Sequence, residues 1–160
     1  MIRSAVLPVF ASLTFAFVCA NARPAIAHCQ VPCGIYGDQL RFEQLLEDQR
    51  TIAKAQGSVN ELSSGSLDAQ GHNQLARWVV TKEDHAQRVQ TTIAEYFLAQ
   101  RIKPDADSYT KTLKAAHKVI IDAMKCKQSA DPATAETLKA SILDLYRAYE
   151  GKEPAFEHSH

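Results

Sequence analysis

The sequence lacks an excess of charge of either sign, and it contains no run of basic residues. Lys and Arg together number 18, Asp and Glu together also number 18, and the formal net charge is therefore zero. Proteins that hold nucleic acid through its phosphates carry a basic patch or stripe. The composition gives no support to a nucleic-acid partner, and we expect none.

Strand-like alternation of apolar and polar residues is also missing over any useful length. Apolar residues instead recur at helical spacing in four segments between residues 38 and 150. Short connections between such segments favour neighbouring antiparallel helices. The sequence therefore predicts an all-α fold, an up-down-up-down four-helix bundle over residues 38–150, preceded by an N-terminal segment considered below.

Capping and breaking residues set the expected helix bounds. Asp38, a residue type favoured at N-caps, opens the first helix, and a loop rich in Gly, Ser and Asn is expected over residues 57–71. Pro104 ends the second helix, and Asp131 with Pro132 opens the fourth. The expected helices are 38–56, 73–101, 105–127 and 131–150, followed by a flexible tail at 151–160. The expected core positions are Phe42, Leu45, Leu46, Ile52, Ala53, Val79, Ala86, Val89, Ile93, Tyr96, Phe97, Tyr109, Leu113, Ala116, Ile120, Ala123, Ala135, Leu138, Ile142, Leu145, Tyr146 and Tyr149.

The N-terminus has the features of an export signal. Residues 1–27 contain no acidic residue and include an apolar run from Ala5 to Ala20, which at 16 residues is short for a membrane span of about 20. Small residues at Ala25 and Ala27 fit the pattern that signal peptidase accepts. We expect a signal peptide cut between Ala27 and His28, and an exported, periplasmic or secreted protein with no membrane anchor. An uncleaved anchor is the alternative.

Cysteine is scarce, and its placement is uneven. Cys19 would leave with the signal peptide, so the exported protein keeps the close pair Cys29 and Cys33 and the distant Cys126. The pair has the spacing C-x3-C, which differs from the C-x2-C of thioredoxin-like redox motifs. The pair therefore indicates either a disulfide or a metal site. Cys126 is expected to be a buried small apolar residue.

Cleavage before His28 would gather several metal donors in one short segment, residues 28–37. The α-amine and imidazole of His28, the backbone nitrogen of Cys29 and the thiolates of Cys29 and Cys33 could all reach one ion. A planar set of two nitrogens and two sulfurs suits Ni(II) or Cu(II), whereas zinc prefers a tetrahedral set. Pro32 would turn the segment back toward the metal, and Gly34 would let the backbone pass close by.

These residues together resemble a known motif. His28-Cys29-x-x-Pro32-Cys33-Gly34-x-Tyr36 is similar to the nickel hook of nickel-containing superoxide dismutases, and it lies at the start of the expected mature chain. The resemblance extends to about Tyr149. It implies a four-helix-bundle subunit that assembles as a hexamer, holds one nickel and converts superoxide to O2 and H2O2.

The resemblance also implies a role for each hook residue. His28 would supply the amine and the imidazole, Cys29 an amide nitrogen and a thiolate, and Cys33 the second thiolate. Tyr36 would stand above the open axial face and help to hold the substrate. Nickel would cycle between Ni(II) and Ni(III), with the imidazole bound in the higher state.

The surroundings of the hook match the family less closely. Glu43 corresponds to a glutamate that hydrogen-bonds the histidine ligand, and Tyr96 to a tyrosine that flanks the substrate channel. The arginine that supports this glutamate falls at His85, a lysine beyond the tyrosine falls at Leu98, and Gln30 stands where Asp is frequent.

Two other functions are compatible with the residues alone. A metal chaperone or sensor could use the same hook to carry nickel or copper without turnover. A structural helical bundle with a Cys29–Cys33 disulfide would bind no metal. The presence of Gly34 and Tyr36 favours the enzyme over both.

Overall fold

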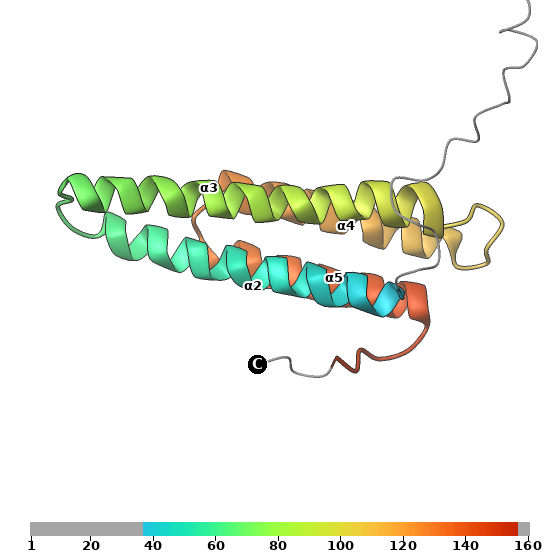
Figure 1. Ribbon diagram of the computed structural model, residues 1–160. Helices are drawn as coiled ribbons and strands as arrows, with labels where there is room; N and C mark the ends of the chain where they lie inside the picture. The colour runs from blue at the N-terminus through green and yellow to red at the C-terminus, as the bar shows by residue number, and fades with distance from the viewer. Residues whose placement is uncertain (1–36, 157–160) are drawn as a thin grey trace, which may run out of the picture.

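The computed structural model describes residues 37–156, and in this part of the chain it is helical without strands. The elements are α2 (Asp38–Ser63), α3 (Ala69–Thr91), the π-helix η1 (Thr92–Arg101) that continues α3, α4 (Tyr109–Gln128) and α5 (Pro132–Glu150). Figure 1 shows the long helices lying side by side, with η1 as the continuation of α3. α2 packs against α3 and α5, and α4 packs against the same two helices. The predicted four-helix bundle is confirmed, whereas the hook lies outside the described residues.

The core is built mainly by the predicted apolar positions, with aromatic rings gathered at one end. Phe42 contacts the rings of Phe97 and Tyr146 at centroid distances of 4.8 and 5.0 Å. The predicted burial fails at two positions. Val79 and Leu113 are 38% and 36% exposed. Four further predicted positions, Ala53, Tyr109, Ile120 and Tyr149, are half-buried against the core.

The helix bounds differ from the predicted ones at both ends of the first connection. α2 continues through Gly57 to Ser63, and α3 begins at Ala69, so the connection is far shorter than the predicted loop. Asp68 caps α3, because its carboxylate accepts a hydrogen bond from the Gly71 amide at 2.7 Å. The Ser- and Gly-rich composition predicted a loop here, but packing between α2 and α3 outweighs the weak helical propensity of these residues.

Two predicted helix starts also need correction. Asp38 is the first helical residue and not the cap, which is Gly37, because the Asp38 side chain is engaged elsewhere. The third helix begins at Tyr109 and not at residue 105, since two successive turns from Lys103 to Tyr109 precede it. Asp131 does cap α5 as predicted, with its carboxylate accepting from the Ala133 amide at 3.0 Å.

The end of the second long helix is wider than an α-helix. In η1 the Ile102 amide bonds the Phe97 carbonyl five residues earlier, at 2.8 Å. Such π-helical turns are rare and frequently occur at functional sites. This stretch places Tyr96 and Phe97, two consecutive aromatic residues, in the buried interior.

Residues 151–156 follow α5 without helical structure. Gly151 ends the helix in the left-handed conformation with φ of 69°, where a glycine is preferred. Phe156 then lies against Tyr146 with ring centroids 5.0 Å apart. None of the helices in the described range 37–156 is long and apolar enough to cross a membrane.

Lys82 of α3 forms hydrogen bonds with the C-terminal end of α4. Its ammonium is buried and donates to the carbonyl oxygen of Cys126 at 2.9 Å and to that of Lys127, and it also pairs with Glu83 at 2.7 Å. The last carbonyls of a helix have no partner within the helix. Lys82 therefore satisfies the C-terminal end of α4 from a neighbouring helix.

We expect Lys82→Met to lower the free energy of unfolding by about 1–3 kcal/mol, because it leaves two carbonyl oxygens without their buried donor. Urea-induced unfolding followed by circular dichroism measures the loss. Lys54→Met, at an exposed position on α2, is the matched control and should change stability little. An equal loss in both variants would contradict this role.

Candidate functional site

The hook residues with a predicted role lie outside the described residues, and these roles stay predictions. These positions are His28, Cys29, Pro32, Cys33, Gly34 and Tyr36. The structure does describe the end of the bundle to which this hook is joined, because α2 begins at Asp38. At the same end η1 and α5 finish and α4 begins (Figure 1).

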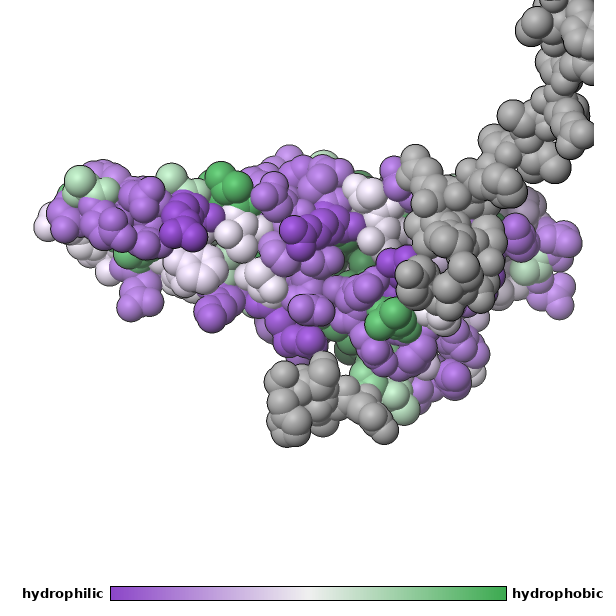
Figure 2. Space-filling view, viewed as in Figure 1, coloured by the Kyte–Doolittle hydropathy of each residue, from purple (hydrophilic) through white to green (hydrophobic). Residues whose placement is uncertain are grey.

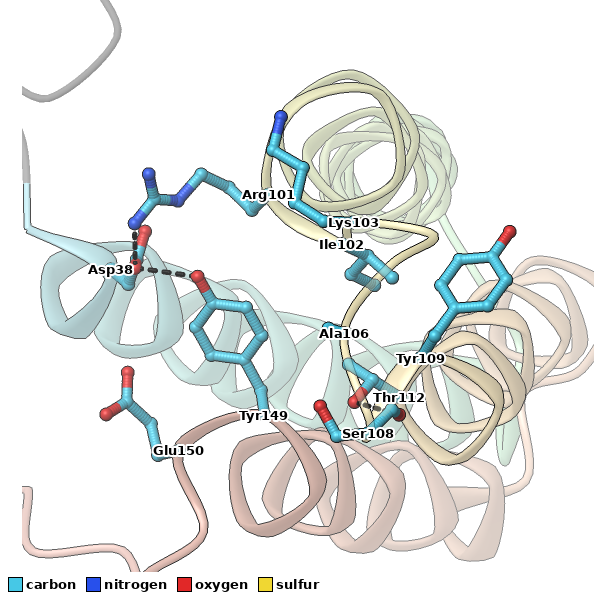
Figure 3. A pocket seen from close by; sticks show the side chains of 10 residues that line it. All are labelled: Asp38, Arg101, Ile102, Lys103, Ala106, Ser108, Tyr109, Thr112, Tyr149 and Glu150. Carbon is cyan, nitrogen blue, oxygen red and sulfur yellow. Dashed lines mark hydrogen bonds and ion pairs between the residues drawn. The ribbon is translucent and has the colours of Figure 1, made fainter.

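Asp38 is the centre of a hydrogen-bonded cluster at this end. Its carboxylate accepts from the Tyr96 hydroxyl at 2.5 Å, from the Tyr149 hydroxyl at 2.8 Å and from the Arg101 guanidinium at 2.5 Å. Figure 3 shows Arg101 and Tyr149 converging on Asp38 from opposite elements. We call Asp38, Tyr96, Arg101 and Tyr149 the Asp38 cluster. It ties α2, η1 and α5 together at the residue that follows the hook in the chain.

The cluster changes the acidity of each of its members. Burial by itself raises the pKa of Asp38, but the hydrogen bonds from Arg101, Tyr96 and Tyr149 outweigh burial and hold that pKa below its ordinary value. Burial and the hydrogen bond to Asp38 raise the pKa of Tyr149 to about 12. The same two causes also raise the pKa of Tyr96. The hydrogen bond to Asp38 raises the pKa of Arg101. At neutral pH the cluster therefore contains one carboxylate, one guanidinium and two neutral phenols.

A cavity of about 360 Å³ opens beside the Asp38 cluster (Figure 3). Asp38, Arg101 and Tyr149 form one side of it, and Tyr109 and Thr112 of α4 contribute to another. The cavity is therefore built where four helix ends meet, beside Asp38, the residue that follows the hook in the chain.

Tyr96 also lies among cationic side chains. The Arg41 guanidinium is 5.2 Å from the centre of its ring, and the Arg101 guanidinium is 6.0 Å from it. Cations within about 6 Å of an aromatic ring are attracted by the ring's charge distribution. The predicted channel tyrosine is thus held by a carboxylate at its hydroxyl and flanked by two arginines.

Glu43 lies on a different side of α2 from the Asp38 cluster. It is half-buried, and its carboxylate accepts from the Gln39 side-chain amide at 3.1 Å. It lines a second cavity of about 530 Å³ between α2 and α5, together with Leu46, Arg50 and Phe156. Tyr96 faces Asp38 and Arg41, which are offset from Glu43 around the helix. Glu43 therefore lies on a different face of α2 from the one that Tyr96 contacts.

His85 has a partner other than Glu43. Its Nδ1 is 2.6 Å from a carboxylate oxygen of Asp48, and both side chains are largely buried between α2 and α3. Burial is the largest influence on Asp48 and raises its pKa, although the His85 contact opposes the shift. The other histidines in the described range, His72 and His117, are exposed. Among residues 37–156 there is no group of three or more His, Cys, Asp and Glu side chains that could hold a metal ion.

The sequence did not reveal Asp38, Arg101 and Tyr149 as site residues. Asp38 matched a helix cap, Tyr149 matched an apolar core position, and Arg101 ended a helix. One clue was available in the sequence. Asp38 directly follows the predicted hook, and a buried carboxylate there needs hydrogen-bond donors from other segments of the chain.

Fold and site define a four-helix-bundle protein with a polar, tyrosine-rich cluster at the end where its N-terminal segment joins. The family model for nickel-containing superoxide dismutases matches residues 23–153, which include the whole hook and all four helices. The chain belongs to this family. It is an oxidoreductase whose cofactor is nickel and whose substrate is superoxide. No curated protein and no solved structure matches it.

Asp38→Asn tests the cluster through its pH dependence. Because the folded-state pKa of Asp38 is lowered, its ionised form adds stability that is present above the unfolded value of about 3.9 and is lost as the pH falls through the folded value. We expect Asp38→Asn to be less stable than the wild type at neutral pH, and the difference to shrink in acid below about pH 4.

Melting temperatures measured across the acidic and neutral range check this expectation. Asp144→Asn is the matched control, since the Asp144 side chain is 61% exposed and pairs with Arg147 on the same helix. A stability difference for Asp38→Asn that stays constant with pH would contradict the electrostatic role.

Proposed function

We propose that this superoxide dismutase holds its nickel in the hook, residues 28–37, after removal of residues 1–27. The motif His28-Cys29-x-x-Pro32-Cys33 and the family match across it support this assignment. The match begins at residue 23, before the expected cleavage site, so it covers the junction itself. Export to a periplasm or medium, the loss of any membrane anchor and assembly as a hexamer belong to the same proposal.

The donor set fits nickel better than the other common metals. Thiolates of Cys29 and Cys33 with the His28 amine and the Cys29 amide nitrogen offer two sulfurs and two nitrogens, a set that suits a planar Ni(II) ion. Bound there, nickel supplies one-electron redox chemistry between Ni(II) and Ni(III), which anionic sulfur and nitrogen donors bring within reach. The amine exists at this position only if the chain begins at His28.

The chain's own residues must then place the hook and admit an anion. Two superoxide ions and two protons give O2 and H2O2, so both negative charge and protons have to reach the site. Arg101 neutralises the Asp38 carboxylate beside the cavity, and Arg41 adds positive charge next to Tyr96. This arrangement avoids an unpaired carboxylate that would repel superoxide.

The tyrosines serve as fixed, neutral groups. Tyr96 and Tyr149 stay protonated at neutral pH because their pKa values are raised, and both hydroxyl protons point to Asp38. Tyr36, two residues before Asp38, would then stand close to this cluster and contact the substrate. Pro32 and Gly34 would shape the hook that precedes Tyr36.

The requirement for a free α-amine gives the first functional test. Protein that begins at His28 should bind about one nickel per chain and dismutate superoxide, whereas protein with one extra N-terminal alanine should lose activity by orders of magnitude. Metal analysis and a superoxide-decay assay on both forms measure this. Equal nickel binding without turnover in the two forms would instead indicate a metal carrier.

Thiol variants separate ligand cysteines from a structural one. We expect Cys29→Ser and Cys33→Ser each to lose nickel, while Cys126→Ala keeps it at an unchanged ratio per folded chain. Cys126 is fully buried in α4, and burial raises the pKa of its thiol, which disfavours the thiolate that metal binding needs. Nickel loss from Cys126→Ala equal to that of the hook variants would contradict the assignment.

A further inference from the structure

The cavity of about 530 Å³ between α2 and α5 has a wall from a third segment of the chain. Residues 151–156 turn back from the end of α5 along the bundle (Figure 1), and Phe156 at their end lines this cavity. The Phe156 ring lies 5.0 Å from that of the buried Tyr146, in an edge-on arrangement that holds the segment in place. Small-molecule sites in proteins are concave spaces of about 300–1,000 Å³. The cavity therefore has the size of a ligand site.

Apolar side chains form the less exposed part of this lining. Leu46 of α2 is 7% exposed, and Leu143 of α5 and Phe156 are half-buried. Gln49, which is also buried here, already donates from its side-chain amide to the Ala135 carbonyl at 3.0 Å. The face seen in Figure 2 is mainly hydrophilic, with hydrophobic residues between α2 and the segment that follows α5. An alkyl chain in this space would remove apolar surface from water on both partners.

The charged side chains around the cavity divide into paired and unpaired groups. Arg147 pairs with Glu153 at 2.9 Å and with Asp144 at 3.0 Å. Arg50 of α2 and Lys139 of α5 are exposed at the cavity, and their side chains form no ion pair within the described part of the chain. The cavity thus offers two unpaired cationic groups, one from each helix.

We propose that this cavity binds a small amphiphilic anion, of which a medium-chain carboxylate is the simplest form. The head group lies between Arg50 and Lys139, where two cations offset its charge. The alkyl chain lies against Leu46, Leu143 and Phe156, the apolar part of the lining. Superoxide has no apolar part and is not this ligand, so the site is separate from the proposed nickel hook.

The remaining unpaired carboxylate of the lining is distant from the head group. Glu43 accepts a hydrogen bond from Gln39 at 3.1 Å, and it precedes Arg50 by seven residues, which is about 10 Å along α2. Exposed charges at such a distance are largely screened at physiological salt. The end of the cavity at Arg50 and Lys139 therefore keeps its preference for an anion.

A second copy of the chain is a poorer occupant of this cavity. A twofold axis through the groove would place Arg50 and Lys139 opposite the same two cations, and like charges in contact disfavour such a pair. The charge of the cavity is complementary to an anion and not to itself.

Competition with 8-anilinonaphthalene-1-sulfonate tests the site, because this amphiphilic anion fluoresces at apolar protein surface. In the nickel-loaded protein octanoate should displace the bound dye, and hexanoate should do so roughly tenfold less well, since each buried methylene contributes about fourfold. The double variant Arg50→Gln/Lys139→Gln should bind octanoate roughly tenfold more weakly, because each partly exposed ion pair contributes up to about fivefold.

Lys54→Gln/Lys114→Gln is the matched control, because it removes the same net charge from exposed positions outside the cavity. It should bind octanoate like the wild type. Nickel content and superoxide decay should be unchanged in both double variants, so a failure of the proposed nickel site is visible separately from a failure of this cavity.

The proposal is overturned if octanoate displaces no dye from the wild type, or if both double variants bind octanoate equally well. Displacement only from protein that ends at Phe156 would assign the cavity to residues 157–160 instead. Dye binding per chain that falls as the protein concentration rises would assign it to a second copy. Either of these results also overturns the proposal.

Discussion

The Asp38 carboxylate fixes the point at which the N-terminal segment enters the bundle. A carboxylate removed from water is costly unless donors surround it, and here donors from η1 and α5 meet a residue of α2. Cys33 precedes Asp38 by five residues, so the two Cα atoms are at most about 18 Å apart. The proposed nickel hook is therefore confined to the end of the bundle where Tyr96, Arg101 and Tyr149 converge. Any force that moves one of these three elements would also move the base of the hook.

Periodicity and breakers predicted most of the fold, because burial of an apolar stripe leaves a clear pattern in a helical bundle. They failed where a helix is held by its neighbour and not by its own sequence. The segment from Gly57 to Ser63 reads as a loop, yet it stays helical against α3. Val79 matches the core stripe but is exposed, since the length of α4 decides whether a partner is present at that level. Neither fact can be read from local composition.

The candidate site likewise has one part that the sequence predicts and another part that only the fold shows. The hook motif is a local feature of the sequence, so its donors could be named from residue types and spacing. The support around it depends on contacts between distant segments. Asp38 and Tyr149 are 111 residues apart in the chain and 2.8 Å apart in the structure. His85 stands where the resemblance implies an arginine that supports the glutamate, and only the fold shows that it contacts Asp48.

Leu98 stands at the position where the resemblance implies a lysine beyond the channel tyrosine. It packs against the core and can carry no charge to the surface. The guanidinium groups of Arg41 on α2 and Arg101 on η1 lie 5.2 and 6.0 Å from the centre of the Tyr96 ring. Arg101 pairs with Asp38, and Arg41 donates to the Gln44 side chain at 2.8 Å. Two guanidinium groups therefore lie beside the Tyr96 ring, one from α2 and one from η1.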